Sequence, residues 1–193
     1  FDCVVGATGR IPNVEALDLE NAHVEYDGHG IAADGFLQTS NPAIYAVGDV
    51  VAKKIPKLTP TASFEGAYLA RRILGDEAEP IAYPPIVSIV YGSPKLAQVG
   101  VGATEAADHA ERYRLDDRDI TGWFTYRRIG EPVSKVKIVR EGERLVGASA
   151  LSSQADALIN HLAILIDSGI VRKDLDRMIL GSPTLASDLS SLM

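Results

Sequence analysis

The stretch that decides the fold of this chain is residues 38–50, which read QTSNPAIYAVGDV. A turn-rich start leads into an apolar strand over residues 44–47, which stops at Gly48 and Asp49. In open α/β sheets, ligands bind at the carboxyl ends of strands. Gly48 would let a ligand approach the backbone closely, and Asp49 could accept hydrogen bonds from sugar or ribitol hydroxyls. The simpler alternative is that Asp49 only caps a turn, and the stretch alone favours that alternative.

A second signal follows at residues 58–62, which read LTPTA and open a helix that we predict over residues 61–74. A helix N-terminus offers unpaired N–H groups and a partial positive charge, which can stabilise an anionic ligand atom. Taken alone, this segment favours a well-capped surface helix with no ligand. Several apolar residues share one face of the predicted helix at helical spacing: Ala62, Leu69, Ala70 and Ile73.

Read together, these two segments and residues 7–13 (ATGRIPN) resemble one family. The family is the flavoprotein disulfide reductases, or pyridine nucleotide-disulfide oxidoreductases, which include glutathione reductase, dihydrolipoamide dehydrogenase and mercuric reductase. The resemblance covers essentially the whole chain, and the segment that ends in Gly-Asp is its most specific part. It continues through residues 84–87, 99–100, 137–139, 146–148 and 183–184.

The resemblance implies roles for particular residues in binding FAD. In the family, the Asp of the Gly-Asp motif binds the flavin ribitol, which gives that role to Asp49 beside Gly48. The Leu-Thr-Pro segment points a helix at the pyrimidine end of the flavin, where a reduced flavin carries negative charge that a helix N-terminus favours. That position falls to Thr59, Pro60, Thr61 and Ala62. Residues 1–13 would mark the return from the nicotinamide-binding domain to the flavin domain.

Several parts that the family's chemistry requires are absent from this sequence. It has no Gly-x-Gly-x-x-Gly turn for FAD or for NAD(P)H. The redox pair needs two cysteines, and Cys3 is the only cysteine. Cys3 lies in an apolar stretch, residues 3–7, that we expect to be a buried strand in which it is a small hydrophobe. Domains seldom begin inside a strand, so we expect the chain to be a catalytically inert fragment of a longer parent.

The C-terminal segment departs from the family pattern. Glutathione reductase and dihydrolipoamide dehydrogenase have a His immediately before a Pro-Thr, followed by a Glu that orients it as the acid–base. Here residues 181–188 read GSPTLASD, so Ser182 replaces the His and Asp188 lies one residue beyond the position of the Glu. Serine does not titrate near neutral pH. We therefore expect that the parent is not an efficient glutathione or lipoamide enzyme, and that its acceptor needs no such base or another group supplies the proton.

Composition narrows the class of partner. Acidic residues outnumber basic ones by 26 to 19, for a net charge of −7, which argues against a nucleic acid partner. No apolar run approaches the roughly 20 residues of a membrane helix, and a single cysteine fits a reducing, cytoplasmic location. We expect the partners to be a second copy of the chain and a small-molecule disulfide or related acceptor. No metal-ligand spacing links the histidines, which are His23, His29, His109 and His161.

The order of elements predicts an α+β fold in two parts. Residues 1–80 would be the C-terminal part of an FAD-binding domain. Residues 81–193 would be a dimerisation domain, in which helices cover one side of an antiparallel sheet. In the second part we predict strands over residues 86–91, 96–101, 123–128, 133–140 and 144–150. We predict helices over residues 104–110, 154–168 and 172–180, the second capped by Ser153. The charged run over residues 111–119 is typical of a solvated face.

Two functions from different classes remain open. In the first, the chain is part of an FAD-dependent NAD(P)H:disulfide oxidoreductase. Hydride then passes from NAD(P)H through FAD and a cysteine pair, which lies outside this chain, to a disulfide or related acceptor. In the second, the chain is a non-catalytic dimerisation or interface module. In either case, the isolated chain need not retain FAD or NAD(P)H.

Overall fold

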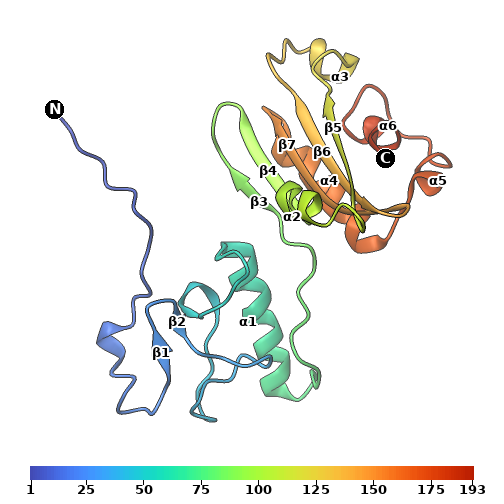
Figure 1. Ribbon diagram of the computed structural model, residues 1–193. Helices are drawn as coiled ribbons and strands as arrows, with labels where there is room; N and C mark the ends of the chain where they lie inside the picture. Colours follow the sequence, from blue (N-terminus) through green and yellow to red (C-terminus); the bar gives the residue numbers. More distant parts are fainter. The chain divides into compact units, whose positions relative to one another are not determined.

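The computed structural model describes residues 1–193 as two compact units, Phe1–Tyr83 and Pro84–Met193 (Figure 1). Each unit has its own hydrophobic core, as expected for parts that fold around separate centres. Together they combine helices with antiparallel strands, which confirms the predicted α+β class. None of the helices combines the length and the hydropathy that crossing a membrane would require.

The first unit holds little regular structure around a small core. Its elements are η1 (Glu15–Leu17), β1 (Tyr26–Asp27), β2 (Gly30–Ile31), η2 (Gly48–Val50) and α1 (Thr59–Leu74), where η denotes a 3-10 helix. Strands β1 and β2 pair antiparallel with each other. The buried core consists of Val14, Leu19, Val24, Ile31, Ala46 and Val51. Turns and side-chain hydrogen bonds therefore hold much of this unit together.

Two strands predicted in the first unit are absent. Residues 1–13 are an irregular arm, almost entirely exposed, and Cys3 is exposed rather than buried. Residues 44–47 form only an isolated bridge, between Tyr45 and Gln38. A strand needs a neighbour to take up its backbone N–H and C=O groups, and residues 44–47 do not lie beside β1 or β2 in a sheet. Apolar composition alone therefore overestimated the strand content.

Helix α1 begins at Thr59 and ends at Leu74, and the next residue, Gly75, adopts a left-handed conformation with φ 85°. Its buried side carries Thr61, Glu65 and Tyr68. The apolar residues that share a helical face are not the buried ones, and Ile73 is 66% exposed. The polar side can face inward because its groups find partners there. For example, the Tyr68 hydroxyl donates to the carbonyl of Glu79 at 2.7 Å.

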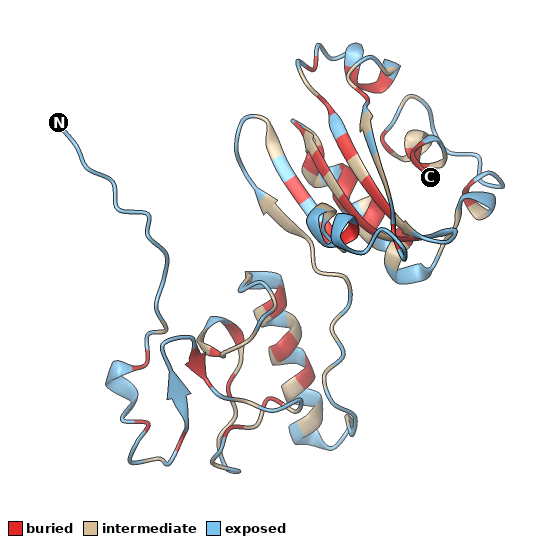
Figure 2. Cartoon of the chain, in the orientation of Figure 1, coloured by how far each residue is buried: buried red, intermediate tan, exposed pale blue.

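The second unit is built on a five-stranded antiparallel sheet with strand order β3-β4-β7-β6-β5. The strands are β3 (Ser88–Val90), β4 (Lys95–Gly100), β5 (Arg114–Asp119), β6 (Lys135–Glu141) and β7 (Arg144–Ser152). The helices are α2 (Ala103–Asp108), α3 (Phe124–Arg127), α4 (Ala155–Ser168), α5 (Arg172–Leu175) and α6 (Leu189–Leu192), with η3 (Ala186–Asp188) before α6. Helix α4 packs on β4 and β7, and the buried positions in Figure 2 concentrate along this contact.

Alternation along the strands and helical spacing along α4 produce this core. Ile138 in β6 and Ala148 in β7 are paired neighbours and both are buried. Helix α4 contributes buried apolar residues one turn apart: Leu158, Ile159, Leu162 and Leu165. It ends where Gly169 adopts φ 63°. The predicted strand pairs and the predicted α4 helix are therefore present, with small shifts at their ends.

The second unit corrects two predictions and adds a strand to a third segment. Residues 123–128 contain the short helix α3 rather than a strand, and Tyr126 is fully buried. The charged run contains the edge strand β5, none of whose residues is buried, so the predicted solvated face is present on a strand. In it, Asp117 pairs across to Lys137 at 3.5 Å. Ser153 does not cap α4. Its hydroxyl donates a hydrogen bond to the carboxylate of Glu131, a loop residue, instead. At Ser153, the long-range partner Glu131 outweighed the local capping signal.

Strand β7 approaches the end of β4 so closely that position 147 has no room for a side chain. A β-carbon at Gly147 would overlap the carbonyl oxygen of Val101 and lie 2.7 Å from its nitrogen. We expect Gly147→Ala to lower the unfolding free energy of the second unit by about 1–3 kcal/mol, measured by urea denaturation. Gly122→Ala is the control, since nothing lies within 4 Å of its added carbon. Equal stability of the two variants would refute the close approach.

Candidate functional site

The Gly-Asp turn forms the 3-10 helix η2, and it packs against the start of α1. Gly48 is buried and has φ 77°, a conformation that favours glycine. A β-carbon at Gly48 would lie 3.3 Å from the β-carbon of Ala62, closer than ordinary van der Waals contact. The two segments singled out in the sequence, residues 38–50 and residues 58–62, are therefore adjacent in the fold.

The start of α1 has polar groups without partners. No side chain caps the helix at Leu58, and Pro60 lies in the first turn. Thr61 is 4% exposed, and its hydroxyl oxygen is buried with no hydrogen-bond partner. A buried polar atom without a partner is uncommon in folded proteins and needs an explanation. A ligand that hydrogen-bonds at this helix N-terminus would provide one.

Asp49 lies at the edge of a hollow of about 600 Å³ formed with the N-terminal arm. The lining residues are Arg10, Ile11, Pro12, Asn13, Asp49, Val50 and Lys57. The Asp49 carboxylate is 3.8 Å from the Arg10 guanidinium, and the two side chains are 52% and 90% exposed. An ion pair as exposed as this contributes little stability, so the carboxylate stays free to accept hydrogen bonds from a ligand.

A buried carboxylate that the sequence analysis missed lies behind the turn. Glu65 of α1 is fully buried, and its Oε2 accepts a hydrogen bond from the backbone N–H of Gly48 at 2.6 Å. Its Oε1 accepts from the Tyr83 hydroxyl at 2.8 Å and pairs with the Lys53 ammonium. Burial, followed by this contact with Glu65, raises the pKa of Tyr83. The available signal was a Glu four residues after Thr61, on the same helix face.

The C-terminal pair from the sequence analysis does not come together. Ser182 is exposed, and no hydrogen bond joins it to Asp188. One Asp188 oxygen is instead buried without a partner. Burial, followed by the nearby charges of Asp188 and Glu131, raises the pKa of Tyr126. The Asp188 carboxylate therefore reaches into the interior of the second unit, where its charge affects Tyr126. Ser182 and Asp188 do not form a hydrogen-bonded pair like the family's His and Glu.

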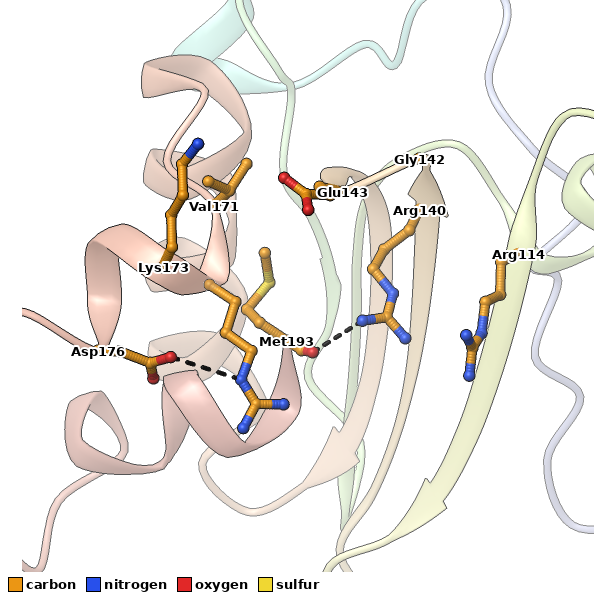
Figure 3. A pocket seen from close by; sticks show the side chains of 9 residues that line it. Arg114, Arg140, Gly142, Glu143, Val171, Lys173, Asp176 and Met193 are labelled. Carbon is orange, nitrogen blue, oxygen red and sulfur yellow. Dashed lines mark hydrogen bonds and ion pairs between the residues drawn. The ribbon is translucent and has the colours of Figure 1, made fainter.

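Figure 3 shows a pocket of about 370 Å³ in the second unit. Its charged lining residues are Arg114, Arg140, Arg172, Lys173, Glu143 and Asp176. Three of the cations already have partners. Arg140 binds Asp116 and donates to the carbonyl of Met193 at 2.7 Å. Arg114 pairs with Asp116 at 3.2 Å, and Arg172 pairs with Asp176 at 3.7 Å. Three of the four lining cations are therefore already paired with an acidic residue, and Lys173 is the exception.

Comparison with known proteins identifies the class. A family model described as pyridine nucleotide-disulphide oxidoreductase matches residues 1–66, and the model of that family's dimerisation domain matches residues 86–192. An uncharacterized 19.7 kDa protein in the mercuric resistance operon of Staphylococcus aureus is 38% identical, over 92% of this chain and all of that protein. The chain belongs to the pyridine nucleotide-disulphide oxidoreductase family, as the motifs predicted.

Other relatives are longer than this chain. Glutathione reductase of Burkholderia cepacia is 34% identical over 99% of this chain and 43% of the enzyme. Dihydrolipoyl dehydrogenase of Bacillus subtilis is 31% identical over 95% of this chain and 39% of the enzyme. The fold is similar to that of the flavoprotein disulfide reductase RclA of Escherichia coli, with a TM-score of 0.85 and 21% identity, over 96% of this chain and 43% of RclA. The chain thus spans less than half the length of these enzymes.

The Asp116–Arg140 pair predicts a pH dependence of stability. Burial raises the pKa of Asp116, but Arg140 and Arg114 outweigh it and leave the pKa below its usual value. The stabilisation is therefore complete above the pKa of the unfolded chain, about 3.9, and is lost as pH falls through the lower folded-state pKa. At pH 7 we expect Asp116→Asn to cost roughly 1.5–3 kcal/mol.

This difference should shrink below about pH 4, as measured by urea denaturation of both proteins from pH 7 to pH 3. Asp108→Asn provides a control in the same unit, because Asp108 is exposed and forms no ion pair. A constant difference between Asp116→Asn and the wild type across this range would contradict the assignment.

Proposed function

We propose that this chain is the C-terminal part of an FAD-dependent NAD(P)H:disulfide oxidoreductase. The observation that carries the proposal is the contact between the Gly48–Asp49 turn and the uncapped start of α1, where the Thr61 hydroxyl is buried without a partner. Family membership supports it, because the longer relatives are named as disulfide reductases and a dehydrogenase. In the proposed enzyme, hydride passes from NAD(P)H through FAD and a cysteine pair to a disulfide or related acceptor.

The residues present fit one part of an FAD site. Asp49 has a carboxylate open to solvent that can accept hydrogen bonds from ribitol hydroxyls. The Thr61 hydroxyl and the free N–H groups at the start of α1 can hydrogen-bond to the electron-rich edge of a flavin. Thr59, Pro60 and Ala62 shape this helix start. When bound, FAD supplies the hydride and electron transfer chemistry that no side chain of this chain provides.

The domain and partner assignments extend this proposal. Residues 1–80 would complete the FAD-binding domain, and residues 81–193, which contain the family's dimerisation domain, would form the contact with a second copy. Ser182 cannot act as an acid–base near neutral pH. We propose that the acceptor is a small disulfide or related molecule whose reduction does not need a base at that position, in a cytoplasmic enzyme.

A second candidate function is a non-catalytic dimerisation module. The observation that favours it is the S. aureus relative, a 19.7 kDa protein that this chain matches over its full length. Such a short protein carries the same parts as this chain. In this candidate function, the chain would serve to associate with a second copy, and it would bind neither FAD nor NAD(P)H.

The flavin role of Asp49 can be tested in the parent enzyme. We expect Asp49→Ala to weaken FAD binding by about 1–3 kcal/mol, because a charged hydrogen-bond acceptor is removed. The measurement is the flavin absorbance retained after dialysis, with the FAD dissociation constant from fluorescence titration. Asp76→Ala serves as a control, since Asp76 is an exposed acid in the same unit whose side chain forms no hydrogen bond or ion pair. Unchanged FAD occupancy in Asp49→Ala would refute the assignment.

Self-association of the chain itself is a separate prediction. A two-fold dimer through one self-complementary surface is the commonest arrangement of identical chains. Sedimentation equilibrium at micromolar concentration should give about twice the chain mass of 20.6 kDa. A colourless dimer would support the module, whereas a dimer that binds added FAD would support the flavoenzyme. A monomer at high concentration would contradict self-association of the chain, both as a module and as part of a dimeric flavoenzyme.

A further inference from the structure

Glu65 presents its two carboxylate oxygens to different partners. Oε1 forms an ion pair with the Lys53 ammonium and accepts a hydrogen bond from the Tyr83 hydroxyl. Oε2 accepts a hydrogen bond from the backbone N–H of Gly48. The Glu65 side chain has no exposed surface and that of Lys53 is 10% exposed, so water cannot replace these contacts. The partners of Oε1 thus orient the carboxylate, and this orientation directs Oε2 at the turn.

The turn is tied to α1 by the hydrogen bond from the Gly48 N–H to Glu65. It also lies so close to Ala62 that a β-carbon added at Gly48 would be 3.3 Å from the Ala62 β-carbon. Ala62 and Glu65 are three residues apart, so they lie on neighbouring positions of one helix face. Gly48 adopts φ 77°, and a fixed acceptor for its N–H selects this conformation from the many that glycine can adopt.

A buried ion pair is not needed to stabilise α1. Burying a carboxylate and an ammonium costs desolvation free energy that their attraction does not always recover. The unit gains a defined geometry from this arrangement, because Asp49 follows Gly48 directly and Thr61 lies one turn before Glu65 on α1. The tyrosine that holds Oε1 has a raised pKa, caused by burial and by the contact with Glu65, so it remains a hydrogen-bond donor at neutral pH.

We propose that Glu65 is a positioning residue, which holds the Gly48–Asp49 turn against the start of α1 and thereby aligns Asp49 and Thr61 toward one ligand. This role rests on the proposed function, since that ligand is FAD in the proposed enzyme. Glu65 itself does not contact the ligand. Its Oε2 fixes the turn, and the Lys53–Tyr83 pair fixes Oε2.

Two double variants separate this role from simple charge balance. Glu65→Gln/Lys53→Met and Glu65→Leu/Lys53→Met both remove the ion pair, but only the first keeps a side-chain oxygen for the Gly48 N–H. The first readout is amide hydrogen exchange in the full chain, which needs no flavin. The Ala32 amide, which donates to the Glu25 carbonyl in the same unit, reports whether the unit as a whole still folds.

In the leucine variant we expect Gly48 exchange to be about tenfold faster than in the glutamine variant, with Ala32 exchange within roughly threefold. Equal Gly48 exchange in the two variants would overturn the proposal. If the leucine variant also loses Ala32 protection, the glutamine variant is compared with the wild type. Because glutamine keeps the acceptor, retained Gly48 protection then supports the proposal, and its loss overturns it.

The second readout is the FAD dissociation constant of the parent holoenzyme. We expect it to be about tenfold larger in the leucine variant than in the glutamine variant, which a purely structural ion pair would not produce. The FAD dissociation constants of the two variants could be equal while Gly48 exchange is slower only in the glutamine variant. Glu65 would then hold the turn without aligning a flavin, and this result would overturn the positioning role. A failed proposed function is recognised separately, because Asp49→Ala would then leave FAD binding unchanged in an otherwise wild-type parent.

Discussion

The first unit depends on one buried charge. Its apolar core is small and its only paired strands are two residues long, so hydrophobic burial alone specifies little of its geometry. Glu65 compensates, because a fully buried carboxylate requires several donors in fixed places. Those donors are the backbone N–H of Gly48, the ammonium of Lys53 and the hydroxyl of Tyr83, the last residue of the unit. Residues 48–53, α1 and Tyr83 are thereby brought to one point.

The second unit is held together mainly by hydrophobic burial. Its sheet buries one face under α4, and the register of the strands follows from alternating apolar residues. Charges there lie mainly at the edge, where β5 and the C-terminal residues are joined through Arg140 and Asp116. This unit therefore has the independent core that a family dimerisation domain needs, whereas the first unit has the polar groups that a ligand needs.

The candidate site combines an unusual backbone with unsatisfied polarity. Gly48 has a conformation that few residues adopt, and Thr61 has a buried hydroxyl without a partner. Either feature alone would have a simple explanation in a turn or in a helix end. Gly48 lies close to Ala62, the residue after Thr61, and Asp49, which follows Gly48, has an accessible carboxylate. This combination, rather than any single residue, makes the first unit the place to look for ligand binding.

The sequence by itself determined the family, the α+β class, the antiparallel strand pairs of the second unit, and the Gly48–Asp49 and Thr59–Ala62 segments. These depend on local patterns: turn residues, alternation, helical spacing and a short motif. Only the tertiary structure decided that residues 3–7 are exposed, that residues 123–128 contain a helix, that Glu65 is buried and that one Asp188 oxygen is buried without a partner. Each of these outcomes depends on partners distant in the sequence, because a strand, a buried charge or a helix cap is stable only when another segment supplies its hydrogen bonds.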